Sequence, residues 1–136
     1  MNPLQSRYPG RFIVIGKDGD SYVALYGATG RSPSSLARKF IQEGNGIYMQ
    51  AVDGTVAAKG NPELLEYPAV KIFENLPAQA GGIVVANGRQ IENISNLESR
   101  DARKQLSYSL SEEAYEPDEY RTPRITGCIV ESESFS

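Results

Sequence analysis

Residues 11–27, RFIVIGKDGDSYVALYG, decide what kind of fold this chain forms. Two runs of β-branched and apolar residues, 11–16 and 21–27, flank a turn with Asp18-Gly19 at its centre, which is the strongest short-range signal for a β-hairpin. Both runs are apolar at nearly every position instead of alternating with polar residues, as in strands that are covered on both faces. We therefore predict a hairpin in a sheet with two buried faces.

Strands are predicted to dominate the first ninety residues. Residues 36–42 fit a strand or a helix equally well, and residues 60–68 are irregular because two prolines interrupt them. The other predicted elements here are a second hairpin, which pairs 46–52 with 55–59 around Asp53-Gly54, and single strands at 69–74 and 82–88.

A helix is predicted over residues 98–115. Ala102, Leu106 and Leu110 recur at the spacing of one helix face, Ser95 or Asn96 can act as N-cap, and Pro117 ends the helix. Residues 124–131, RITGCIVE, are predicted to form the last strand, and the chain then closes in a polar tail.

Length, charge and composition limit the possible functions. The 136 residues, at 14.9 kDa, suit one domain, and the net charge of −3 argues against duplex nucleic acid as a partner. The chain has no histidine and one cysteine, Cys128, which excludes Ser-His-Asp and Cys-His catalysis, histidine zinc sites and an internal disulfide. The apolar run near the start covers only residues 12–15, too short for a signal peptide or a membrane span. We expect a cytoplasmic protein with no membrane partner.

Four places could carry chemistry, and each has an ordinary alternative. Residues 29–35, TGRSPSS, combine glycine, hydroxyls and an arginine as a phosphate site would, although the pattern alone favours a plain surface loop. Tyr67 precedes a proline and could simply be a core aromatic. Asn87-Gly88 places an amide at a strand end, but it is also a common turn pair.

The fourth place is residues 115–124, YEPDEYRTPR, where three carboxylates, two tyrosines and two arginines fall within ten residues. A solvated acidic helix end would explain the carboxylates. Arg124 is harder to explain in that way, because an arginine that opens an apolar strand needs an anionic partner.

Together these places resemble the archaeal-type IMP cyclohydrolases. The resemblance is carried by YPGR at 8–11, TGRS at 29–32, Asn61-Pro62 before Tyr67, VVANG at 84–88 and, most specifically, YEPDEYRTPRI at 115–125. It implies an α/β (α+β) fold with antiparallel sheets, arranged as a four-layer α/β/β/α sandwich like that of the N-terminal-nucleophile (Ntn) hydrolases. Family chains are longer, so we expect residues 1–136 to be a single IMP cyclohydrolase-like domain that lacks the C-terminal part of the family fold.

The resemblance also implies an enzyme, a cyclohydrolase that closes the ring of 5-formamidoimidazole-4-carboxamide ribonucleotide to give IMP and water in purine biosynthesis. The family pattern implies a catalytic site containing Tyr67 and Glu116. We expect Arg31 to anchor the phosphate or clamp carbonyl oxygens, Ser32, Asn87, Gly88 and Arg124 to bind substrate, and no metal or cofactor to be needed.

Other readings stay open. A non-catalytic purine-nucleotide-binding protein would keep Arg31, Ser32 and Asn87 but could lose Tyr67 and Glu116. An amidohydrolase would need an N-terminal nucleophile, which the sequence does not support, and a structural or subunit-interaction protein would carry the polar clusters on its surface. We also expect a homo-oligomer or association with a separate C-terminal segment, because strand 124–131 is rich in apolar residues and only a short tail follows it.

Overall fold

The structure is a computed structural model and describes residues 10–30, 32–52, 62–131 and 134–135. The predicted hairpin is present as β1 (Arg11–Asp18) and β2 (Ser21–Ala28), an antiparallel pair that forms a two-stranded sheet. Gly19 at its turn has φ of 59°, in the left-handed region that glycine occupies without strain. The predicted hairpin is therefore confirmed, but its two turn residues are Gly19 and Asp20, one position after the predicted Asp18-Gly19, because Asp18 pairs with Ser21.

The other strands form a six-stranded antiparallel sheet in which each strand pairs with the next along the chain. Its members are β3 (Arg38–Glu43), β4 (Gly46–Ala51), β5 (Tyr67–Phe73), β6 (Gly82–Ala86), β7 (Thr126–Val130) and β8 (Ser134–Phe135). The helices are α1 (Pro33–Leu36), α3 (Pro62–Leu65), the 3-10 helix η2 (Arg89–Asn93) and α4 (Ala102–Ser109).

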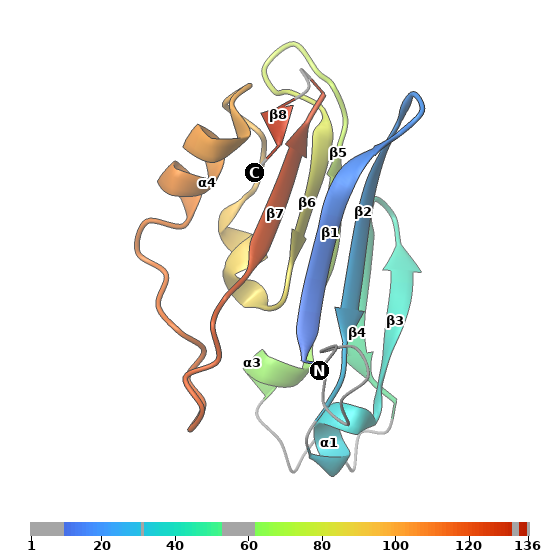
Figure 1. The fold of residues 1–136 in the computed structure, drawn as a ribbon, viewed down its shortest axis with the longest axis vertical. Coiled ribbons are helices and arrows are strands. Elements are labelled where there is room, and N and C mark those ends of the chain that lie inside the picture. The colour runs from blue at the N-terminus through green and yellow to red at the C-terminus, as the bar shows by residue number, and fades with distance from the viewer. Residues whose placement is uncertain (1–9, 31, 53–61, 132–133, 136) are drawn as a thin grey trace.

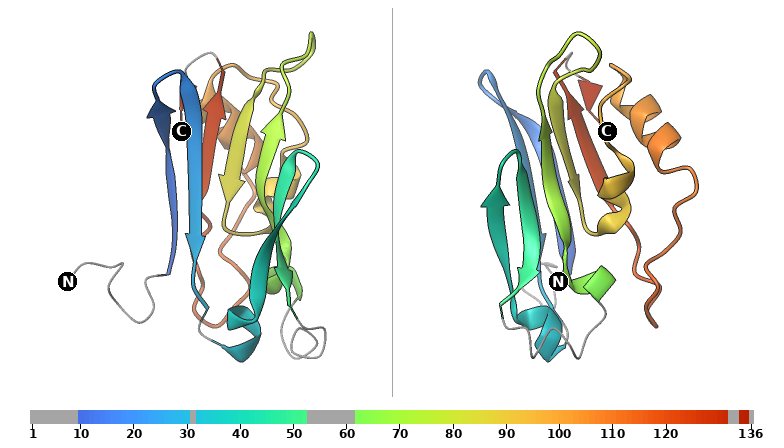
Figure 2. Two further views of the ribbon diagram at one scale, coloured as in Figure 1. Left: turned by 90° about the vertical axis from the view of Figure 1, so that its right-hand side faces the viewer. Right: turned by 180° about the vertical axis from the view of Figure 1, so that it is seen from behind.

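These elements form three layers (Figures 1 and 2). The hairpin packs on one face of the large sheet, with β1 against β7 and β2 against β6, while α4 and η2 pack on the other face. Gly127 in β7 allows the close approach of the hairpin, because a Cβ there would lie 3.1–3.2 Å from the side chains of Ile13 and Ile15. The fold is therefore mixed α and β with antiparallel sheets, as predicted.

The main core lies between the large sheet and its helices. Alternate residues of β6 and β7 point into it, and Leu106 and Leu110 of α4 pack against them, which confirms the predicted helix face. Its fully buried members are Ala80, Val84, Ala86, Ile91, Ile94, Leu97, Ala102, Cys128 and Val130. Val85 and Ile129, on the opposite face of the same strands, are also buried. The continuous apolar runs at 82–86 and 126–130 thus belong to strands covered on both faces.

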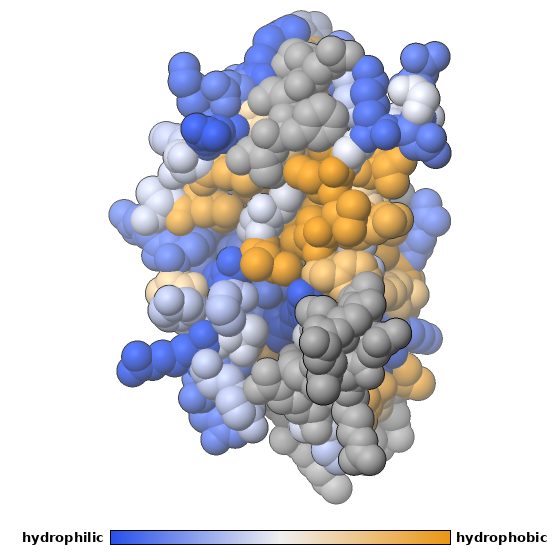
Figure 3. Space-filling model, viewed as in Figure 1, coloured by the Kyte–Doolittle hydropathy of each residue, from blue (hydrophilic) through white to orange (hydrophobic). Residues whose placement is uncertain are grey.

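The hairpin itself is covered on one face only. Phe12, Val14 and Leu25 point away from the large sheet and are 40%, 51% and 54% exposed, and Figure 3 shows an apolar patch over β1 and β2. The prediction that both faces of the hairpin are buried is therefore wrong for the described residues. The four-layer sandwich is not confirmed either, since the part of the chain that the structure describes shows three layers.

Several element boundaries also differ from the predictions. Residues 38–43 form a strand, and β4 pairs with it through a turn at Gly44, whose φ is 56°; the proposed partner strand 55–59 lies outside the described residues. Helix α4 begins only at Ala102, because the Asp101 side chain, rather than Ser95 or Asn96, accepts from a backbone N–H as N-cap. In the described residues, no helix is long and apolar enough to cross a membrane.

Candidate active site

A buried ion pair joins the start of β1 to the loop after α4. Arg11 Nη1 and Nη2 donate to the two carboxylate oxygens of Glu116 at 2.5 and 3.1 Å, and Glu116 is only 3% exposed. Burial alone would lower the pKa of Arg11, but the hydrogen bonds and charge of Glu116 outweigh burial and raise that pKa above its ordinary value. Arg11 is therefore a fixed cation that holds Glu116 in a bidentate grip.

The loop of residues 116–122 is built to direct Glu116 inward. Glu116 N donates to Thr122 O at 3.0 Å, and the Asp118 carboxylate accepts from the backbone N–H of Thr122 at 2.9 Å and from its hydroxyl. Arg121 adopts φ of 48°, which turns the chain at the loop tip. Of the acidic residues in this motif, Glu119 is exposed while Glu116 is buried, so a solvated acidic surface does not account for the motif.

The end of β6 meets the ion pair from the other side. Arg11 Nη1 also donates to Asn87 O at 2.6 Å. Asn87 is 1% exposed, and its amide is engaged within the protein: Nδ2 donates to Pro123 O, while Oδ1 accepts from Gln90 Nε2 and from the backbone N–H of Ile125. Asn87 therefore ties β6 to the strand that follows the 116–122 loop.

Gly88 lies where the side chains of three other residues converge. A Cβ at this position would lie 2.8 Å from Gln90 Oε1, 3.1 Å from Glu116 Oε1 and 3.3 Å from Arg124 Nη1. Arg124 donates from Nη1 to Gln90 Oε1 and from Nε to Ala114 O, and it forms an ion pair with Glu113 at 3.2 Å. Arg124 thus has the anionic partner that its position led us to expect, and this partner is Glu113. Glu116 pairs with Arg11 instead.

Tyr67 opens β5 beside the same cluster. Its hydroxyl lies 2.6 Å from the hydroxyl of Tyr26 in β2, and both tyrosines are among the groups that raise the pKa of Arg11. Tyr67 is 3% exposed and belongs to a small second core with Met49 and Ala69. It is therefore a buried core aromatic, as the ordinary alternative predicts, and its hydroxyl is hydrogen-bonded to Tyr26.

The polar loop after β2 is attached next to Arg11. Thr29 N donates to Gly10 O at 3.1 Å, and Gly10 N donates to the Thr29 hydroxyl at 3.2 Å, with Gly10 at φ of 87°. These hydrogen bonds bring Thr29 next to Gly10, the residue before Arg11. Ser32 is exposed and caps α1, where its hydroxyl accepts from Ser35 N at 3.2 Å. Arg31 lies outside the described residues.

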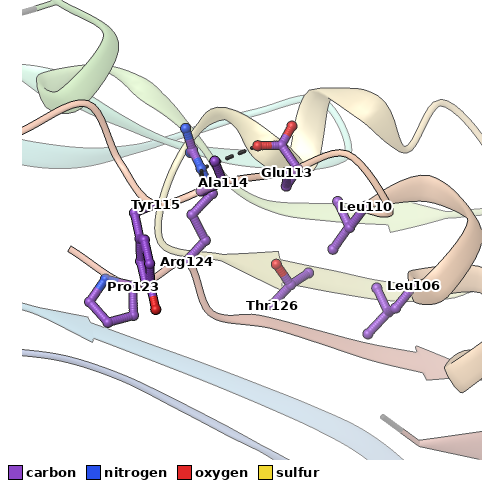
Figure 4. A pocket seen from close by; sticks show the side chains of 8 residues that line it. All are labelled: Leu106, Leu110, Glu113, Ala114, Tyr115, Pro123, Arg124 and Thr126. Carbon is purple, nitrogen blue, oxygen red and sulfur yellow. Dashed lines mark hydrogen bonds and ion pairs between the residues drawn. The ribbon is translucent and has the colours of Figure 1, made fainter. Parts of the chain in front are cut away.

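A cavity of about 500 Å³ opens between α4 and the 113–126 segment, and Arg124 lines it (Figure 4). Tyr115, Pro123 and Arg124 gather at one end, and Leu106 and Leu110 lie at the other. The remaining lining residues are Glu113, Ala114 and Thr126. Among the described residues, no group of Cys, Asp and Glu side chains is arranged to hold a metal ion.

Arg11, Tyr26 and Gln90 complete the cluster and were not among the predicted site residues. Arg11 could have been found, because the argument made for Arg124 applies equally to an arginine that opens β1. Tyr26 carried no signal of its own, since a tyrosine within an apolar strand is common in cores. The roles given to Tyr67, Gly88, Glu116 and Arg124 stay predictions, and sequence reasoning did not name Arg11, the residue that pairs with Glu116.

Comparison with known families supplies the context of this arrangement. The family model described as IMP cyclohydrolase-like protein matches residues 8–136. The chain belongs to this family. Every motif brought together in the cluster lies within the matched residues.

Curated archaeal relatives in this family carry the name IMP cyclohydrolase. The chain is 35% identical to the protein of Thermococcus kodakarensis over 124 residues, 90% of this chain and 56% of that one. It is 32% identical to the protein of Methanocaldococcus jannaschii over 130 residues and 34% identical to that of Haloquadratum walsbyi over 131, in both cases 94% of this chain and 59% of the relative. The chain thus spans a little more than half the length of the IMP cyclohydrolases that it matches.

Proposed function

We propose that this protein is an IMP cyclohydrolase, which closes 5-formamidoimidazole-4-carboxamide ribonucleotide to IMP and water. The observation that carries the proposal is that the Arg11–Glu116 ion pair is buried against Gly88, with Arg124 also close to Gly88 and with Tyr67 among the groups that raise the pKa of Arg11. These residues come from separate segments of the chain, and Glu116 and Tyr67 are almost fully buried. Membership of the family, and relatives that carry the name IMP cyclohydrolase, support the same reaction.

The reaction is intramolecular, so holding the formyl group against the carboxamide supplies much of the rate. The amide nitrogen forms a bond to the formyl carbon and loses a proton to Glu116, while Tyr67 donates a proton to the formyl oxygen, on which negative charge develops. The C–O bond of this adduct then breaks, and the oxygen takes its second proton from Glu116 and leaves as water. The formamido nitrogen loses its proton to Tyr67 as the C=N bond of the ring forms, so both side chains return to their starting states. Arg11 orients Glu116, and its buried Nε, which has no hydrogen-bond partner among the described residues, is a donor for a substrate oxygen.

The remaining assignments concern binding. Arg31 and Ser32 anchor the phosphate, in a loop that the Gly10–Thr29 hydrogen bonds fix next to Arg11. Gly88 lets Glu116 and Arg124 approach the backbone closely, and Arg124 contacts the base from the side of the cavity. Asn87 acts by holding the walls of the site together, because its amide oxygen already accepts two hydrogen bonds. No step in this scheme requires a metal or a cofactor.

The alternative is a purine-nucleotide-binding protein without activity. Both functions would use Arg31 and Arg124, but binding alone gives no reason to bury Glu116 against Arg11. Incubating the purified protein with the formamido ribonucleotide separates the two. We expect IMP to form at the same rate with and without EDTA, while binding without turnover by a folded sample would favour the alternative.

The exposed face of the hairpin concerns the assembly. We propose that Phe12, Val14 and Leu25 are covered by a second copy of the chain, because neighbouring apolar side chains exposed on a strand pair are typical of an interface. The alternative occupant of this face is the second helical layer of the four-layer sandwich, supplied by a separate C-terminal segment. Cys128 is a buried free thiol, which suits a reducing compartment, and we propose a cytoplasmic location.

A further inference from the structure

The hydroxyls of Tyr26 and Tyr67 are hydrogen-bonded to each other, and which of them is the donor bears on catalysis. The two oxygens are 2.6 Å apart, so one hydroxyl donates its proton to the other. A phenol has only one proton, so the hydroxyl that donates within the pair cannot donate elsewhere. Which tyrosine is the internal donor therefore decides whether Tyr67 can protonate a substrate oxygen.

The surroundings of Tyr26 fix its position and keep it protonated. Its ring makes an edge contact with Phe40 at 5.9 Å and packs on the Met49, Tyr67 and Ala69 cluster. Burial raises the pKa of Tyr26 far above its ordinary value, and Tyr67 raises it further, against smaller opposing effects of Arg11 and Arg38. Tyr26 thus retains its proton throughout the pH range in which proteins are stable.

Tyr67, which opens β5, is the member of the pair to which the proposed function gives the catalytic proton. Because that single proton is donated to the departing oxygen, Tyr26 must be the donor in the 2.6 Å hydrogen bond between the two hydroxyls. When Tyr67 gives up its proton, the hydrogen bond from Tyr26 stabilises the oxygen that remains.

We propose that Tyr26 is a positioning residue, which donates its hydroxyl proton to Tyr67 and so directs the proton of Tyr67 toward the oxygen that leaves the substrate. Tyr26 does not touch the substrate and acts only through Tyr67. This inference rests on the proposed function, in which Tyr67 donates to the departing oxygen.

A double-mutant cycle in the full chain tests this role. Tyr26→Phe keeps the ring and its packing on Phe40 and removes only the hydroxyl. We expect kcat to fall about tenfold or more, with KM and the affinity for IMP unchanged, because the lost hydrogen bond matters only once charge develops. In a Tyr67→Phe background, adding Tyr26→Phe should cause no further loss, because the group through which Tyr26 acts is already gone.

Tyr22→Phe is the matched control. Tyr22 lies four residues earlier on the same strand, and its hydroxyl donates to Glu131 O at 2.9 Å, away from the cluster. Its loss should leave kcat and KM at wild-type values.

The outcomes separate this inference from the proposed function. The inference is wrong if wild type forms IMP but the effects of the two substitutions on kcat multiply in the double variant. It is also wrong if Tyr26→Phe changes only KM. In either case Tyr26 has a packing role. If Tyr67→Phe is fully active, the inference fails together with the role of Tyr67, while the reaction itself stands. If wild type gives no IMP, both the function and the inference are overturned.

Discussion

At the scale of single residues, the Arg11–Glu116 pair is the most costly feature of the structure. Removing two charges from water costs several kcal/mol per ion. The attraction between the two charges often only offsets this desolvation cost, so such pairs add little net stability. Glu116 nevertheless lies 3% exposed in a loop whose own hydrogen bonds direct it inward. A chemical role explains this placement better than a contribution to folding does.

Glu116→Gln tests that role directly. The amide has nearly the same shape but cannot accept the proton from the attacking nitrogen, so we expect kcat to fall about a hundredfold or more while IMP affinity changes little. Glu119→Gln is the control, because Glu119 is an exposed acid of the same loop. Steady-state kinetics and IMP titration are the measurements, and a change confined to KM would show that Glu116 binds substrate without acting as a base.

Arg11→Met tests the other half of the pair through stability. The substitution leaves a buried carboxylate without its cation, and we expect the free energy of unfolding to fall by about 3–5 kcal/mol. The same change in a Glu116→Gln background should cost clearly less, because no charge is then left uncompensated. Urea unfolding of the four proteins measures this, with the exposed Arg103→Met as control. Equal losses in both backgrounds would mean that Arg11 stabilises the fold independently of Glu116.

At the scale of elements, local signals predicted well and long-range ones did not. The β1–β2 hairpin depends on a turn at Gly19 and on flanking strands that are adjacent in the sequence, so the sequence alone was sufficient to place it within one residue. Helix α4 was predicted over 98–115 but covers only Ala102–Ser109, because Asp101 caps its start and the chain turns after Leu110, well before Pro117. Arg11 and Glu116 meet across 105 positions, and the polar tail gains a strand only because β7 offers an edge.

Strand β7 gives a prediction about pH. Burial raises the pKa of the Cys128 thiol from 9.0 to about 11. The unfolded chain therefore loses this proton first, so the stability contributed by Cys128 is complete below about pH 9 and is lost as the pH rises to about 11. We expect Cys128→Ala to be less stable than wild type at pH 8 and the difference to shrink toward pH 11.

Denaturant unfolding of the wild type and of the Cys128→Ala variant at several pH values provides this measurement, with the stability of each protein followed across the pH range. In the same samples, a thiol reagent should modify Cys128 at pH 8 only after unfolding, because the thiol is buried and protonated. Rapid labelling of the native protein, or a difference in stability that stays constant with pH, would contradict the raised pKa.

At the scale of the whole molecule, the three layers leave one asymmetry. The large sheet is covered by helices on one face and by the hairpin on the other, but the outer face of the hairpin carries Phe12, Val14 and Leu25 in contact with solvent. Val14 and Leu25 are cross-strand partners, so their side chains form a single apolar surface. A two-fold axis through this surface would let two copies cover each other with the same residues.

Self-association through this face is the last prediction. We expect the purified protein to scatter light as a particle of twice 14.9 kDa, with an interface of about 1,200 Å² or more. Val14→Lys combined with Leu25→Glu places opposite charges across the strand pair, which preserves the hairpin but makes the face too polar to bury, so this variant should be a monomer. Tyr108→Lys, on the exposed side of α4, is the control and should remain a dimer. A wild-type monomer would exclude the second copy, and a particle whose intact mass includes another polypeptide would assign the face to a separate segment instead.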